Sequence, residues 1–110
     1  MDIKNWTIEE FKAYLLIYAS QSNFNESEEQ VDTIESKFDN QMIDKIKKEI
    51  KILNDYDRIS LVTDYIKLNK ISQNELDSIL IEIKDIYKAD GYFDSVEKSI
   101  FIMLEKLLKV

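Results

Sequence analysis

The sequence predicts an all-α protein, a compact bundle of about six helices. The chain has one glycine and no proline among its 110 residues, so few positions break a helix. Apolar residues also recur at helical spacing in six segments, and most segments follow a residue type that caps helix N-termini. At this length we expect one domain, residues 1–110, with a core large enough to need no disulfide.

The first two predicted helices are separated by a polar run. Thr7 and Glu10 form a capping box, and the apolar residues that follow predict a helix over 8–20. The pair Asn25 and Glu28 has the spacing of a second helix start, which predicts a short helix beginning after Asn25.

The two middle helices are also predicted from capping residues and apolar spacing. Asp39 opens the third, whose buried face is a stripe of apolar residues: Ile43, Ile46, Ile50 and Leu53. The lysines of this helix lie away from the stripe, and Asp44 and Glu49 interrupt them. A solvated face is therefore favoured over a basic patch for Lys45, Lys47, Lys48 and Lys51. A turn at 54–57 and a fourth helix over 58–68 come next.

The last two helices meet at the only glycine. Ser72 and Glu75 start a fifth helix that runs to a corner at Gly91, where a positive φ is expected. The sixth runs from Ser95 nearly to Val110 and is apolar almost all round. Such a helix is typical of a bundle centre or of a dimer interface, so a homodimer through the C-terminal helix is one expectation.

A weak internal repeat relates the two ends of the chain. Sliding the sequence along itself superimposes three identical pairs in one register: Tyr18 on Tyr87, Phe24 on Phe93 and Glu28 on Glu97. The sequence therefore predicts two pseudo-symmetric helical hairpins joined by the third and fourth helices. The capping residues of the long helices, Thr7 and Ser72, lie closer together than these pairs do, which predicts that the second long helix is about one turn longer.

The corner carries the candidate metal ligands Asp90, Asp94 and Glu97. Carboxylates around a turn are ligands suited to Ca²⁺ or Mg²⁺, so the sequence predicts a divalent cation site here. A helix cap explains Asp94 and Glu97 equally well, whereas Asp90 lies at a helix C-terminus, where negative charge is disfavoured. An EF-hand is excluded, since Ile86 and Lys88 would fall on ligand positions of that loop.

Residues 89–97, Ala-Asp-Gly-Tyr-Phe-Asp-Ser-Val-Glu, resemble the Ala-Asp-Gly-x-(apolar)-x-x-x-Glu signature of the TerB-like family of tellurite-resistance proteins. The duplicated layout resembles that family too. The resemblance implies a compact all-α fold, an acidic cluster suspected of binding metal cations, and a role in tellurite resistance or a stress response. In the first half Gln21-Ser22 stands where Asp-Gly would be expected, so a paired acidic site would lack one carboxylate.

Composition narrows the function further. The chain has no histidine and no cysteine, which removes the commonest general base and thiolate metal ligands. A net charge of −7 disfavours binding to nucleic acid, and no apolar run approaches the length of a membrane span.

We expect a cytoplasmic, non-enzymatic protein that binds a divalent cation at the corner or a protein partner beside it, with Tyr92 as a contact. The alternative is an acidic interaction module of the inhibitor or immunity type, which neutralises a basic protein without a metal. A two-carboxylate hydrolase using Asp90 and Glu97 is a third, weaker hypothesis.

Overall fold

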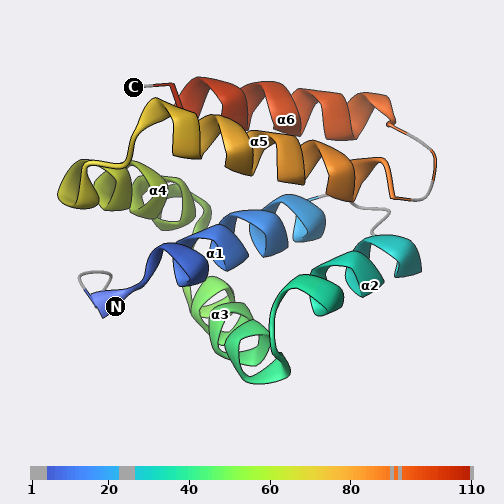
Figure 1. Ribbon diagram of the computed structural model, residues 1–110, viewed down its shortest axis with the longest axis horizontal. Coiled ribbons are helices and arrows are strands. Elements are labelled where there is room, and N and C mark those ends of the chain that lie inside the picture. Colours follow the sequence, from blue (N-terminus) through green and yellow to red (C-terminus); the bar gives the residue numbers. More distant parts are fainter. Residues whose placement is uncertain (1–4, 23–26, 90, 92, 110) are drawn as a thin grey trace.

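A computed structural model describes residues 5–22, 27–89, 91 and 93–109 (Figure 1). These residues form six α-helices and no strand, which confirms the predicted all-α bundle. The helices are α1 (Ile8–Gln21), α2 (Glu28–Lys37), α3 (Asn40–Ile52), α4 (Asp55–Asn69), α5 (Gln73–Tyr87) and α6 (Ser95–Leu107). No helix of the described chain is long and apolar enough to cross a membrane.

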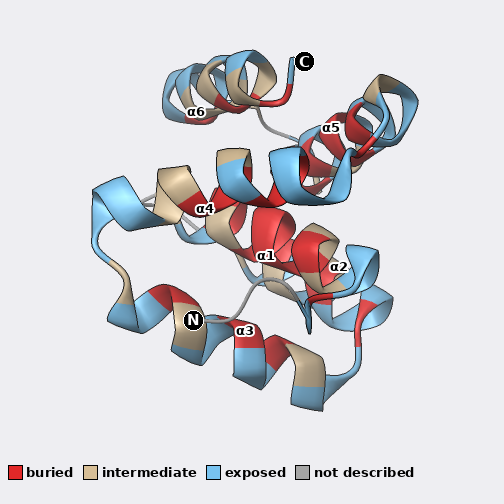
Figure 2. Cartoon of the chain, turned by 90° about the vertical axis from the view of Figure 1, so that its left-hand side faces the viewer, coloured by how far each residue is buried: buried red, intermediate tan, exposed pale blue. Residues whose placement is uncertain are grey.

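The central helix of the bundle is α1. More than half of it is buried, and it packs against α2, α3 and α5 (Figure 2). Of the two places expected for the C-terminal helix, the bundle centre and a dimer interface, the bundle centre is wrong. Only Glu97 and Leu104 are buried within α6, which packs mainly against α5 and leaves Val96 and Ile102 exposed. A helix at one edge of a bundle buries mainly the face that meets its main neighbour, however apolar its remaining surface is.

Two helices begin at residues other than the predicted ones. The cap of α2 is Ser27, whose side chain accepts a hydrogen bond from the backbone N–H of Gln30, so the predicted start after Asn25 is wrong. Asn25 itself lies outside the described residues. The predicted turn at 54–57 is instead the start of α4, because Asn54 caps it by accepting from the N–H of Asp57 at 2.8 Å.

The caps of the helices α2 and α6 do not align in the register of the predicted repeat. Helix α1 has 14 residues and α5 has 15, so the predicted extra turn in α5 is wrong. The helices that follow them, α2 and α6, are capped by Ser27 and Asp94. Superimposing these two caps defines what we call the cap register. It aligns Gln30 with Glu97, because each is the third helical residue after its cap.

Buried tyrosines connect helices that are distant in sequence. The hydroxyl of Tyr87 donates to the carbonyl oxygen of Ala19 at 2.7 Å, and that of Tyr14 donates to the carbonyl oxygen of Arg58 at 2.8 Å. Burial raises the pKa of both phenols well above the usual value. Both groups thus stay neutral donors in the folded protein over a wide pH range.

These two tyrosines predict a loss of stability at alkaline pH. Unfolded tyrosine loses its proton near pH ~10, whereas folded Tyr14 and Tyr87 keep theirs. The free energy of unfolding is therefore unaffected by these phenols below about pH 10. Above that pH, each of the two phenols lowers it by about 1.4 kcal/mol per pH unit. Urea unfolding at about pH 9, 10 and 11 measures the slope. Tyr87→Phe should reduce this slope by the contribution of one tyrosine. An unchanged slope would contradict the conclusion that buried Tyr87 stays protonated.

Candidate functional site

The corner between α5 and α6 is built by backbone geometry and caps. Gly91 has a φ of +86°, as predicted, and its N–H donates to the carbonyl oxygen of Lys88 at 2.9 Å. A Cβ on Gly91 would have nothing within 4 Å, so the backbone conformation alone favours glycine there. Asp90 and Tyr92 lie outside the described residues, so the structure describes neither predicted contact.

The structure brings Asp94 and Glu97 together as a capping box. Asp94 Oδ1 accepts from the N–H of Glu97 at 2.8 Å, and Glu97 Oε1 accepts from the N–H of Asp94 at 3.1 Å. The second carboxylate oxygen of Glu97 accepts from Gln30 Nε2 at 2.7 Å, and the residue is only 2% exposed. Both carboxylates therefore already stabilise the start of α6. Among the described residues, no group of three or more potential ligands is placed to hold a metal ion.

Gln30 is the residue of this corner that sequence reasoning missed. It is fully buried in α2, and its Oε1 has no hydrogen-bond donor among the described residues. The signal was present in the sequence, because the cap register aligns Gln30 with Glu97. The predicted repeat hid this relation by aligning Glu28, which is exposed, with Glu97.

An open groove of about 400 Å³ lies beside the corner, between α5 and α6. We call it the lysine groove, and its lining residues are Lys84, Lys88, Phe93, Lys98, Phe101 and Ile102. The Phe93 ring meets the Phe101 ring edge to face, with centroids 6.1 Å apart. The amines of Lys88 and Lys98 each lie 5.9 Å from the centroid of Phe93, and the amine of Lys84 lies 5.8 Å from that of Phe101.

The lysine groove is positive on a chain whose net charge is −7. Among the described residues, its lining includes three lysines and no carboxylate. No ion pair joins these lysines to an acidic residue within the described part of the chain. Their amines remain near the aromatic faces through cation–π contacts, which are weak enough at an exposed site to leave the amines available to a ligand.

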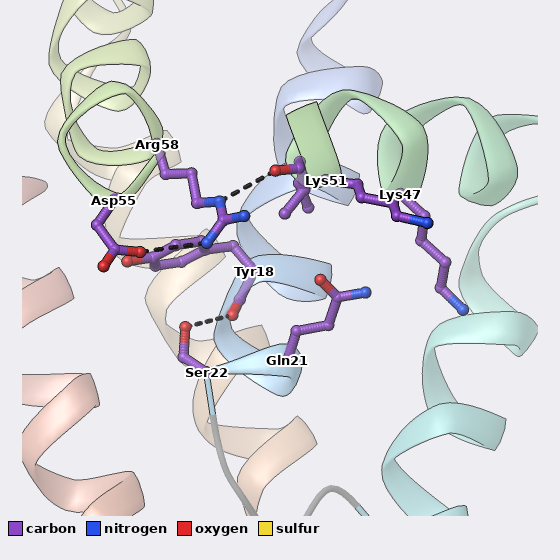
Figure 3. Close-up of a pocket in the computed structure, with 8 residues that line it drawn as sticks. Tyr18, Gln21, Ser22, Lys47, Lys51, Asp55 and Arg58 are labelled. Carbon is purple, nitrogen blue, oxygen red and sulfur yellow. Dashed lines mark hydrogen bonds and ion pairs between the residues drawn. The ribbon is translucent and has the colours of Figure 1, made fainter. Parts of the chain in front are cut away.

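A second depression, of about 660 Å³, opens at the other corner, where α1 ends (Figure 3). We call it the cationic hollow, and its lining residues are Tyr18, Gln21, Ser22, Lys47, Ile50, Lys51, Asp55 and Arg58. Lys47 and Lys51 are exposed, as the predicted solvated face of α3 requires. Sequence reasoning did not predict that they share a depression with Arg58 of α4, although their spacing places them on one side of α3.

Arg58 is held in place from both its backbone and its side chain. Its carbonyl oxygen accepts from the buried Tyr14 hydroxyl, and its Nε donates to the carbonyl oxygen of Ile50 at 3.0 Å. Its Nη1 pairs with the carboxylate of Asp55 at 3.2 Å (Figure 3). The guanidinium is therefore a fixed charge at the wall of the hollow, unlike an unrestrained surface arginine.

Comparison with known proteins found no matching family model, curated protein or solved structure. Within the described part of the chain, the fold and its surfaces define a small helical protein with two cationic depressions and a capped acidic corner.

Proposed function

We propose that this chain is a non-enzymatic binding protein that docks an acidic, amphipathic protein segment in the lysine groove. The observation that carries the proposal is the arrangement of three lysine amines around the Phe93 and Phe101 rings in one open groove. The TerB-like resemblance of residues 89–97 stays a prediction, and the proposal does not depend on it.

The chemistry of the groove selects the occupant. Its floor is apolar, and Ile102 at its edge is 51% exposed, so burying this floor requires an apolar or aromatic anchor. The lysine amines around the floor require carboxylates flanking that anchor. A helix or extended segment that alternates acidic and apolar residues provides both in one short stretch.

Two other occupants fit this groove less well. In a symmetric homodimer through α6, groove against groove, the lysines of one copy would face those of the other. A basic partner, as an acidic inhibitor or immunity module would require, is repelled by the same lysines and would need a different face of the molecule.

The experiment that tests the proposal starts from a displayed library of random peptides selected against the folded chain. We expect enriched sequences to combine an aromatic or aliphatic anchor with flanking Asp or Glu. Their binding should weaken as salt rises, because exposed charge pairs are screened. Enrichment of basic or uncharged sequences would contradict the proposal.

A divalent cation at the acidic corner is a second candidate function, and one observation favours it. The buried Oε1 of Gln30, which has no donor among the described residues, belongs to the side chain that contacts Glu97. The contact with Glu97 is made by Nε2, so a cation bound by both side chains would require the Gln30 amide to turn its Oε1 toward Glu97. A cation would have to share Glu97 with the donors of the capping box. The TerB-like resemblance supports the same site, with Asp90, Asp94 and Glu97 as ligands.

Titration with Ca²⁺ or Mg²⁺ followed by NMR tests this second candidate. Binding at the corner should shift the side-chain amide of Gln30 and the backbone amides of Asp94 and Glu97. In Asp90→Asn those shifts should weaken, whereas Asp44→Asn, at an exposed position of α3, should leave them unchanged. No movement of these signals at millimolar cation would leave the corner with a structural role alone.

A further inference from the structure

We infer that the cationic hollow at the end of α1 binds a small organic phosphate, one that joins a planar ring to a phosphate monoester. The hollow is separate from the lysine groove and shares no lining residue with it. This site therefore stands whether or not the groove docks a protein segment.

Charge is the first argument. Lys47, Lys51 and Arg58 supply three positive charges and Asp55 one negative charge, which leaves the described lining residues with a net charge of about +2. A phosphate monoester carries about −1.5 to −2 at neutral pH, so it matches this charge. The chain as a whole is at −7, so the hollow is a local exception to its charge.

Preorganisation is the second argument. The hydrogen bond from Arg58 Nε to the carbonyl oxygen of Ile50 fixes the guanidinium before any ligand arrives, and the one from Tyr14 holds the Arg58 backbone. The N–H donors of this fixed guanidinium that are not used by Ile50 and Asp55 lose little conformational entropy on binding a phosphate. Lys47 and Lys51, on α3, have long side chains that can close on the remaining oxygens.

Shape is the third argument. The volume of about 660 Å³ lies within the range typical of small-molecule sites. The Tyr18 ring, already stacked on Tyr14 with centroids 6.2 Å apart, supplies an aromatic wall for a planar group. In the view of Figure 3, the amide of Gln21 lies between the guanidinium of Arg58 and the amine of Lys47, where it can bind polar edges of the ring.

Adenosine monophosphate is a suitable probe because it has a ring and one phosphate monoester. We expect it to shift the NMR signals of Tyr18, Gln21 and Arg58 and to bind more tightly than either adenosine or inorganic phosphate. Equal binding of inorganic phosphate would overturn the ring part of the inference. No shift of these signals at millimolar nucleotide would overturn it entirely.

Variants of the hollow's lysines test whether binding depends on this site or only on the net charge of the protein. Lys47→Gln with Lys51→Gln should weaken binding by roughly tenfold or more, since two charge-assisted contacts are lost. The matched control pairs Lys48→Gln with Lys67→Gln, two exposed lysines outside the hollow, and should leave affinity within about twofold. Equal losses in both double variants would show non-specific attraction and overturn the site. These lysines are exposed, so the substitutions leave the core intact.

Discussion

Replacing Glu97 with alanine is expected to lower the free energy of unfolding by roughly 2 to 4 kcal/mol. Two losses combine in this variant. The N–H of Asp94 loses its capping-box acceptor, and the fully buried Gln30 Nε2 loses its partner. An unpaired buried donor costs more than the hydrogen bond itself contributed, because its interaction with water was already lost on folding. Urea unfolding at neutral pH measures the change.

A double-mutant cycle assigns this loss to the contact between Glu97 and Gln30. Glu97→Ala and Gln30→Ala together should cost less than the sum of the single variants, with a coupling of roughly 0.5 to 3 kcal/mol. Glu28→Ala is the matched control, because Glu28 is exposed although the predicted repeat aligns it with Glu97. Its cost should be about 0.5 kcal/mol or less. A Glu28 variant as damaging as the Glu97 variant would contradict the cap register.

Reversing the charge of the lysine groove should abolish docking of an acidic peptide. Lys84→Glu, Lys88→Glu and Lys98→Glu in one chain remove three attractive contacts and add three repulsive ones. We expect the dissociation constant to rise by roughly a hundredfold or more. Fluorescence anisotropy of a labelled peptide from the selection measures the change.

The control for this variant carries the same change of net charge elsewhere. Lys48, Lys67 and Lys70 are exposed and do not line the groove, so their replacement by glutamate gives the same net charge as the groove variant. Docking to this control should fall by roughly threefold at most, since distant exposed charges are screened at physiological salt. A loss as large as that of the groove variant would mean that net charge, and not the groove, controls affinity.

The helices were predictable because their start signals are local. Thr7, Ser72 and Asp94 each cap the helix that the sequence assigned to them. Where two candidate caps lie close together, local pattern is ambiguous, and α2 and α4 begin at positions the sequence did not predict. The place of α6 at one edge could not be predicted, because helix packing depends on contacts distant in sequence.

The candidate sites were harder to predict than the helices. Glycine and capping residues marked the corner, yet the buried contact of Gln30 with Glu97 joins opposite halves of the chain. The cationic hollow joins three helices, and its key residue Arg58 was assigned only to a helix start. The lysine groove depends on which faces of α5 and α6 meet, since neither helix alone shows the cluster. Residue spacing within one helix shows which side chains share a face, but it does not show which other helix that face meets.

The central claim is that the lysine groove is the docking surface of this protein, and NMR mapping of a selected acidic peptide tests it most directly. The account predicts that the amide signals of Phe93, Lys98 and Phe101 shift on titration and that paramagnetic labels on the peptide broaden the same signals. Shifts and broadening centred on Gln21 and Lys51 of the cationic hollow, with the groove signals unmoved, would contradict the account.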